Sequence, residues 1–305
     1  MGVMRVWAPS QDVAGVLVDL PDVECSVYDG GDTPPEGAES VEVWIPPLIP
    51  PGPLREMLGR MAKLRLVQTV TAGVEPYRPY IPDGVILCNA RGVHDAGTAE
   101  WAVGAMISVV RDFPAFTLAQ RTGEWTYRHT GVLADSTVLI VGYGSIGQAL
   151  ERRLAGFEVE VVRVARTARE GVYGMDDLPA LLPQADVVVL LVPVTPDTVK
   201  MVDAGFLARM KDGAVLVNAA RGSVVETDAL VAELTAGRLR AALDVTDPEP
   251  LPQDHPLWTA PGVLITPHVA GSTPASVRRT CKLVRSQMLR YLSGEPLNNV
   301  ITGSY

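Results

Sequence analysis

The sequence has few cysteines, and none of them fits a metal site or a disulfide framework. Among 305 residues there are three, Cys25, Cys88 and Cys281. None belongs to a Cys-x-x-Cys pair or a Cys/His ligand spacing, and their number is odd. We therefore expect no structural disulfide and no bound metal, and interpret the three side chains as buried, unreactive thiols.

Long apolar runs are also absent. No segment is long and apolar enough to cross a bilayer, and the N-terminal residues lack the apolar stretch of a secretory signal. These absences favour a soluble cytoplasmic protein without a membrane partner.

Positive charge is in deficit. The 26 basic residues stand against 35 acidic ones, which gives a net charge of −9. Without a basic stripe such a chain repels a phosphate backbone, so we expect no nucleic-acid partner, although a local site for a small anion remains compatible. A hydrophobic fraction of 47% is typical of a packed globular protein, and the length favours two domains.

Short apolar runs alternate with helical patterns such as Ile146–Ala155 and Thr227–Thr235. Runs rich in Val and Leu are typical of strands buried on both faces of a parallel sheet, so the pattern predicts a doubly wound α/β architecture. The predicted strands are Val13–Leu20, Val41–Ile45, Leu66–Thr69, Val85–Leu87, Thr137–Val141, Val159–Val164, Val187–Val192, Ala214–Asn218, Ala241–Val245 and Val263–Thr266. Thr98–Arg111 reads as a long helix, Phe113–Tyr127 as a looser aromatic stretch, and Pro274–Leu292 as a last helix that returns to the first domain.

A glycine motif predicts a dinucleotide site in the second half of the chain. Gly142, Gly144 and Gly147 follow the predicted strand Thr137–Val141 directly and open a helix, which is the context that gives a GxGxxG motif its weight. The first glycine permits a tight turn, the second admits the pyrophosphate and the third allows close helix packing. The amides of Ser145 and Ile146 at the helix start would face the diphosphate. A glycine-rich turn in another α/β protein is the alternative.

No carboxylate ends the second strand of this unit, where NAD-binding proteins usually carry one for the ribose 2′-hydroxyl. Arg166, Thr167 and Arg169 stand there instead. Arginine can form bidentate, charge-assisted bonds to a phosphate. The sequence therefore predicts a preference for NADP(H), with NAD(H) as a possible ligand; a solvated basic turn is the alternative.

Four ordered motifs then carry a family resemblance. They are Val217-Asn218-Ala219-Ala220-Arg221-Gly222, Ala242-Leu243-Asp244-Val245, Pro248-Glu249-Pro250-Leu251 and Thr266-Pro267-His268, and Thr71-Ala72-Gly73-Val74 and Thr98-Ala99-Glu100 also match. Together they resemble the D-isomer-specific 2-hydroxyacid dehydrogenases over nearly the whole chain, and the pattern is most similar to the glyoxylate/hydroxypyruvate reductase branch.

The resemblance implies a catalytic trio of Arg221, Glu249 and His268. Hydride transfer to a 2-oxoacid needs a proton on the carbonyl oxygen, which a histidine suits. Glu249 would orient and tune His268, while Arg221 would bind the substrate carboxylate and polarise the carbonyl. Taken singly, each residue has a structural alternative: a strand-end cap, a solvated loop carboxylate and a structural histidine.

The resemblance also implies further ligand contacts. On the cofactor side these are Asp244, which would accept from the nicotinamide carboxamide, and Pro193, Thr198 and Ala219. A structural capping role is the alternative for Asp244. On the substrate side, amides of Ala72 and Gly73 would receive the carboxylate. Trp44 would wall a small pocket, or else be a buried core aromatic, and Arg91 and Tyr127 are further candidates.

The resulting expectation is a Rossmann cofactor domain, residues 97–272, inserted into a flavodoxin-like substrate domain formed by residues 1–96 plus 273–305. The protein would reduce small 2-oxoacids such as glyoxylate or hydroxypyruvate with NADPH, as a homodimer in which Thr98–Arg111 packs between subunits. The chain ends soon after its last helix, unlike phosphoglycerate dehydrogenases that carry a regulatory domain. A dinucleotide-sensing corepressor-like protein and a phosphite dehydrogenase-like oxidoreductase are the alternatives.

Overall fold

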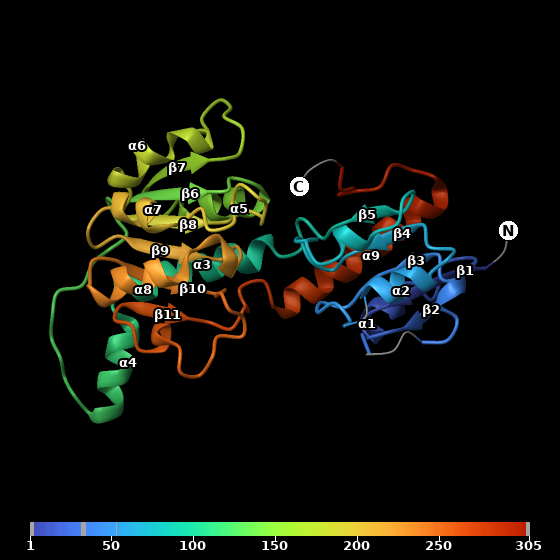
Figure 1. Cartoon of the computed structure of the whole chain (residues 1–305), viewed down its shortest axis with the longest axis horizontal. Helices are drawn as coiled ribbons and strands as arrows, with labels where there is room; N and C mark the ends of the chain where they lie inside the picture. Colours follow the sequence, from blue (N-terminus) through green and yellow to red (C-terminus); the bar gives the residue numbers. More distant parts are fainter. Residues whose placement is uncertain (1–2, 32–34, 53, 303–305) are drawn as a thin grey trace. The chain divides into compact units, whose positions relative to one another are not determined.

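The protein was analysed as a computed structural model that describes residues 3–31, 35–52 and 54–302. It divides into two compact units, one formed by Met1–His94 with Thr273–Tyr305 and the other by Asp95–Ser272. The sequence placed the first boundary two residues later; residues 1–2 and 303–305 of the predicted range lie outside the described part. Figure 1 shows both units.

The first unit is built on a parallel five-stranded sheet. Its order is β2-β1-β3-β4-β5, the order of flavodoxin-like folds. The strands are β1 (Met4–Ala8), β2 (Val23–Val27), β3 (Val43–Trp44), β4 (Leu66–Gln68) and β5 (Ile86–Cys88). Helices α1 (Gln11–Gly15) and α9 (Pro274–Ser293) pack on one face with Val6, and α2 (Leu54–Arg60) packs on the other with Trp7.

The predicted strand Val13–Leu20 is wrong. The segment forms α1 and the turns that follow it, and the first two strands lie on either side of it, at Met4–Ala8 and Val23–Val27. Val13, Ala14, Leu17 and Leu20 are buried, whereas Val18 is 74% exposed. This spacing belongs to a helical face, so the run buries one side only.

The second unit is a six-stranded parallel sheet in the order β11-β10-β9-β8-β6-β7. Its strands are β6 (Thr137–Val141), β7 (Glu160–Val164), β8 (Val187–Leu190), β9 (Val215–Asn218), β10 (Arg240–Leu243) and β11 (Val263–Ile265). The chain passes from β6 outward to β7 and then back to β8 on the other side of β6. The order therefore reverses at β6, and ligands of such sheets bind beyond the carboxyl ends of the strands at that point.

Helices cover both faces of this second sheet. Alternate residues of β6 point to opposite sides: Val138 and Ile140 pack with α3 (Asp95–Val110) and α5 (Ser145–Leu154). Leu139 and Val141 pack on the other face with α6 (Leu178–Leu181), α7 (Ala204–Arg209) and α8 (Thr227–Thr235). The doubly wound Rossmann architecture predicted from the sequence is confirmed.

The small residues of α3 allow this helix to pack closely inside the second unit. Ala99, Ala102 and Ala105 are buried, and α3 packs closely against α5. The next helix, α4 (Phe113–Thr122), has no buried residue, and Figure 1 shows it standing clear of the sheet. In the described part of the chain no single helix is long and apolar enough to span a membrane, and α3 with α4 qualifies only as a pair bent by 62°.

Candidate functional site

The glycine loop lies between β6 and α5, at the carboxyl end of the first strand of the second unit. Gly142 has φ +103°, and a Cβ there would lie 2.6 Å from the backbone carbon of Leu191. The backbone therefore passes too close to the end of β8 for any side chain. A Cβ on Gly147 would lie 3.2 Å from the Gly142 carbonyl oxygen, so helix and loop are packed closely.

Gly144 has different surroundings. It is the N-cap of the ten-residue α5, and a Cβ there would meet no atom within 4 Å. The amides of the first turn, including those of Ser145 and Ile146, begin the helix here, and the Ser145 hydroxyl donates to Asp95 Oδ1 at 3.2 Å. An open helix N-terminus behind a glycine fits the diphosphate of a dinucleotide.

The basic loop predicted to read a 2′-phosphate follows β7. Arg166, Thr167 and Arg169 are all exposed, and the strand ends in the buried, uncharged Val164 and Ala165. The Arg169 Nη2 donates to the carbonyl oxygen of Tyr143 in the glycine loop at 2.9 Å. One of the predicted cations thus lies against the predicted phosphate loop.

The loop after β8 brings Pro193 and Thr198 together. The Thr198 hydroxyl donates to the Pro193 carbonyl at 2.7 Å and accepts from the Thr195 amide at 2.7 Å. Thr198 is buried and Pro193 is exposed. Thr198 therefore fixes the shape of the loop, and contact of the exposed Pro193 with a cofactor stays a prediction.

The segment after β9 is held by Asn218. This fully buried side chain donates from Nδ2 to the Arg221 carbonyl at 3.0 Å and accepts the Ala220 amide at Oδ1 at 3.0 Å. Ala219 and Arg221 are partly exposed beside it, and Arg221 Nη1 donates to the Ala220 carbonyl at 2.7 Å.

Gly222 joins this segment to the next. A Cβ there would lie 1.9 Å from the Thr246 carbonyl oxygen, so the backbone after Arg221 touches the chain that leads to Glu249. Only glycine permits this approach. Arg221 and Glu249 thus come from loops in direct backbone contact.

Glu249 and His268, both predicted to be catalytic, form a hydrogen-bonded pair. The His268 Nδ1 lies 2.6 Å from Glu249 Oε1, and both side chains are more than two-fifths exposed. Because an ionised carboxylate can only accept, Nδ1 carries the proton in this pair. The other ring nitrogen, Nε2, is then the one that can exchange a proton with a ligand.

Asp244 holds the loop that carries His268. It is 3% exposed; its Oδ1 accepts from the Thr266 hydroxyl at 2.6 Å and the Val269 amide at 2.9 Å, and its Oδ2 accepts from the Ala270 amide at 2.8 Å. The Asp244 carbonyl accepts the His268 amide at 2.7 Å. The hydrogen bonds of Asp244 within the protein are therefore those of a structural cap. Because a carboxylate can accept about four hydrogen bonds, the three seen here leave one acceptor position for the predicted cofactor amide.

In the first unit, the Thr71–Gly73 loop follows β4 and is held by its carbonyl groups. The Ala72 carbonyl accepts from Asn89 Nδ2 at 2.7 Å, the Thr71 carbonyl from the Thr69 hydroxyl at 2.8 Å, and the Gly73 carbonyl from the Thr71 hydroxyl at 2.7 Å. Ala72 is partly exposed and Gly73 is buried. These three hydrogen bonds hold the loop, and its amide contacts with a substrate stay a prediction.

Three other substrate-side candidates have distinct surroundings. Trp44 is fully buried, with its ring 6.0 Å from that of Tyr77, so the core-aromatic alternative describes it and the pocket-wall expectation does not. Arg91 is exposed, and its backbone is held by Asn89 and Asn299. Tyr127 is 81% exposed and contacts the ring of His129.

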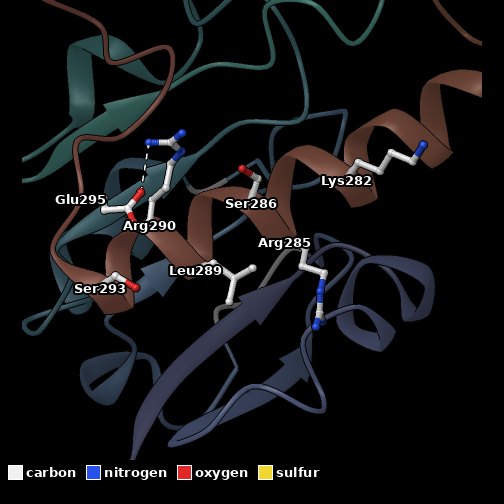
Figure 2. Close-up of a pocket in the computed structure, with 7 residues that line it drawn as sticks. All are labelled: Lys282, Arg285, Ser286, Leu289, Arg290, Ser293 and Glu295. Carbon is white, nitrogen blue, oxygen red and sulfur yellow. Dashed lines mark hydrogen bonds and ion pairs between the residues drawn. The ribbon is translucent and has the colours of Figure 1, made fainter.

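The first unit also has a hollow on its surface along α9 (Figure 2). It measures about 400 Å³ and is lined by Lys282, Arg285, Ser286, Leu289, Arg290, Ser293 and Glu295. Two of its cations are paired, Arg285 with Asp19 at 2.6 Å and Arg290 with Glu295 at 3.4 Å. No predicted site residue lines it, so we do not place the active site there.

The two asparagine side chains whose amide groups hold the loops of the candidate site were not identified from the sequence. Asn218 and Asn89 are both buried and each holds a loop that carries a candidate residue. Asn218 ends a predicted strand and Asn89 follows one. A polar side chain at the end of a buried strand was the feature of the sequence that could have identified both. Tyr143, between the first two glycines, was also missed.

Comparison with known proteins identifies the same family that the sequence motifs resemble. Residues 103–270 match the model of the D-isomer specific 2-hydroxyacid dehydrogenase, NAD binding domain. A glyoxylate reductase of Thermofilum pendens is 33% identical over 79% of this chain and 75% of its own. A D-3-phosphoglycerate dehydrogenase of Methanocaldococcus jannaschii is 32% identical over 81% of this chain, which spans only 49% of that protein. A D-isomer specific 2-hydroxyacid dehydrogenase of Xanthobacter autotrophicus Py2, solved in complex with NADPH and MES, superposes with a TM-score of 0.85 at 30% identity, covering 99% of this chain and 98% of the other.

Proposed function

This chain belongs to the D-isomer-specific 2-hydroxyacid dehydrogenase family, and from that premise we propose that it reduces small 2-oxoacids to D-2-hydroxyacids with NADPH. The observation that carries the proposal is the His268–Glu249 pair at 2.6 Å, on loops that follow strands of the cofactor-binding sheet. Such a pair can deliver one proton to the oxygen of a carbonyl that is being reduced.

The chemistry divides between cofactor and protein. When bound, the nicotinamide supplies a hydride to the carbonyl carbon. His268 gives the proton from Nε2 to the carbonyl oxygen, and Glu249, which accepts from Nδ1, stabilises the protonated ring and keeps its orientation. In the direction of alcohol oxidation the neutral His268 removes the hydroxyl proton.

Arg221 supplies the positive charge of the proposed site. Its backbone is fixed by Asn218 and by the close approach of Gly222 to Thr246. We assign its guanidinium to the substrate carboxylate and to the carbonyl oxygen, where negative charge develops during reduction. The amides of the Thr71–Gly73 loop are the proposed second contact for that carboxylate.

The proposed preference for NADPH rests on charge at the end of β7. No carboxylate stands there for a ribose 2′-hydroxyl; Arg166, Thr167 and Arg169 are exposed, and Arg169 contacts the glycine loop. The similar Xanthobacter protein is described as a complex with NADPH. Bonds between charged partners contribute about 1.5–3 kcal/mol each, enough for a ten- to hundredfold preference.

Glyoxylate and hydroxypyruvate are the proposed substrates. A similar protein is named a glyoxylate reductase, and the motif pattern resembles the same branch. The test is oxidation of NADPH and NADH in parallel with glyoxylate, hydroxypyruvate, pyruvate and a bulky aromatic 2-oxoacid, with phosphite and NADP⁺ as a further assay. Faster turnover of the two small acids with NADPH supports the proposal. Equal or better rates with NADH, or activity on phosphite alone, contradict it, and no turnover at all favours the dinucleotide-sensing alternative.

We also propose that the protein is a homodimer whose contact surface lies on α4 and the segment after it. This part of the chain exposes large apolar side chains, which soluble monomers seldom gather in one region. They are Phe113, Leu118, Trp125, Tyr127 and Val132. A second copy of the chain is the proposed occupant, and packing of α3 between subunits stays a separate prediction.

A further inference from the structure

Tyr143 lies between the first two glycines of the motif and is joined to three other elements. Its hydroxyl donates to Glu151 Oε2 on α5. Arg163 of β7 donates from Nε to Glu151 Oε1 at 2.8 Å and also from Nη2 to the same oxygen. Arg169, from the loop after β7, donates from Nη2 to the Tyr143 carbonyl at 2.9 Å. The two guanidinium carbons each lie 5.8 Å from the centre of the Tyr143 ring.

The two arginines differ in how their charge is compensated. Arg163 forms an ion pair with Glu151, and donation from Arg163 is the main reason that the pKa of Glu151 lies below its usual value. Glu151 is thus ionised and neutralises Arg163. Within the described residues, Arg169 forms no ion pair, and its guanidinium contacts the Tyr143 carbonyl and ring. Arg169 therefore keeps its charge for another anion.

The position of Arg169 is fixed by backbone hydrogen bonds. It exchanges two of them with Val172, at 2.9 and 2.8 Å, in a tight turn whose next residue, Tyr173, bonds to β7. The Tyr143 amide donates to the carbonyl of Val164 at the end of the same strand at 2.8 Å. The guanidinium thus lies at the junction of glycine loop and second strand, where the adenosine ribose lies in this fold. A hollow of about 450 Å³ lies alongside β7 and includes Arg169 in its lining.

We propose that Tyr143 is a specificity-determining residue: its carbonyl and ring face hold the Arg169 guanidinium where it receives the 2′-phosphate of NADPH. Glu151 contributes by neutralising Arg163, which lies as near to the Tyr143 ring as Arg169 does, so that the charge left for a ligand is that of Arg169. A cation on an aromatic face is partly oriented and partly desolvated before the ligand arrives. The inference rests on the proposed use of NADPH and names the residues that produce it.

The test is calorimetric titration with 2′,5′-ADP and with 5′-AMP, which differ by the 2′-phosphate and need no catalysis. We expect the wild type to bind 2′,5′-ADP at least about tenfold more tightly, and Arg169→Gln to bring the ratio near one. Tyr143→Leu should lower the ratio about two- to fivefold, whereas Tyr143→Phe, which keeps the ring, should retain it. Arg209→Gln, at an exposed position of α7, is the matched cation control and should leave the ratio unchanged, whereas Arg166→Gln tests the other arginine of the loop after β7.

The outcomes separate this inference from the proposed function. A wild-type ratio near one overturns the NADPH preference and this inference with it. A wild-type preference that survives Arg169→Gln but is lost in Arg166→Gln overturns the inference alone. Equal weakening of both ligands by Tyr143→Leu also overturns it, because the ring then supports the glycine loop without selecting the phosphate. Thermal unfolding of each variant checks that the fold is kept, and Arg169 is exposed, so that variant is expected to fold.

Discussion

At the scale of single residues, the proposed chemistry depends on the 2.6 Å contact between His268 Nδ1 and Glu249 Oε1. Glu249→Gln keeps an acceptor of similar size and removes the charge that stabilises protonated His268. Because bonds to charged groups contribute about 1.5–3 kcal/mol, we expect kcat to fall about ten- to hundredfold. NADPH affinity, measured by fluorescence, should stay the same. Unchanged kcat, or a parallel loss of cofactor affinity, would show that Glu249 has another role.

Asp244 allows a separate test, of stability. Its three acceptor bonds hold the segment around His268, and Asn in its place would point an amide N–H at the Ala270 amide. An unsatisfied buried donor costs about 1–3 kcal/mol, so Asp244→Asn should lower the free energy of unfolding by that amount. Urea denaturation measures it. Wild-type stability in this variant would contradict the structural role, and a loss confined to cofactor affinity would favour the carboxamide contact alone.

At the scale of elements, two glycines of the same loop are expected to have different roles: Gly142 in stability and Gly144 in cofactor binding. Gly142→Ala puts a Cβ 2.6 Å from the Leu191 backbone at φ +103°, and should cost at least about 2 kcal/mol of stability. Gly144→Ala meets no atom within 4 Å, so its melting temperature should match the wild type. Its Cβ would occupy the space proposed for the diphosphate, and should weaken NADPH binding by about tenfold or more. Equal effects of the two substitutions on both measurements would refute this division.

Helices with little or no buried apolar face were the hardest elements to predict. The segment Phe113–Tyr127 reads as a loose aromatic stretch, yet residues Phe113–Thr122 form α4. No residue of α4 is buried, so its apolar side chains follow no core-facing period that a sequence could reveal. The strands of the second unit, buried on both faces, were predicted to within a few residues because continuous apolar runs mark them.

At the scale of the whole molecule, the proposed dimer predicts that α4 and its following segment control assembly. Leu118→Glu with Trp125→Ala places charge and removes apolar area on a region where Trp125 is 97% exposed. Sedimentation velocity should show a dimer for the wild type and a monomer for this variant. Val18→Lys, an exposed apolar position of the first unit, should remain dimeric. A wild-type monomer at micromolar concentration, or a dimer in all three proteins, would contradict the assignment of this surface.

The order of motifs along the chain identified most of the candidate site, since residues that follow parallel strands meet at one edge of a sheet. Arg221, Glu249 and His268 follow β9, β10 and β11 in this way. What the sequence could not provide are contacts across loops: the support of Arg221 by Asn218, of the His268 segment by Asp244, and of Arg169 by Tyr143. These depend on loop geometry, which apolar periodicity does not encode. Trp44 shows the same limit, because an aromatic at a strand end fits both a core and a pocket.

The central claim is that His268, held by Glu249, gives the proton that accompanies hydride transfer from NADPH to a small 2-oxoacid. The most direct measurement is single-turnover oxidation of enzyme-bound NADPH by hydroxypyruvate, in the wild type and in His268→Asn. Removal of a general acid should slow this step by about 10²–10⁴-fold while the Kd for NADPH stays within about twofold of the wild type. A rate within a few-fold of the wild type in His268→Asn would contradict the account.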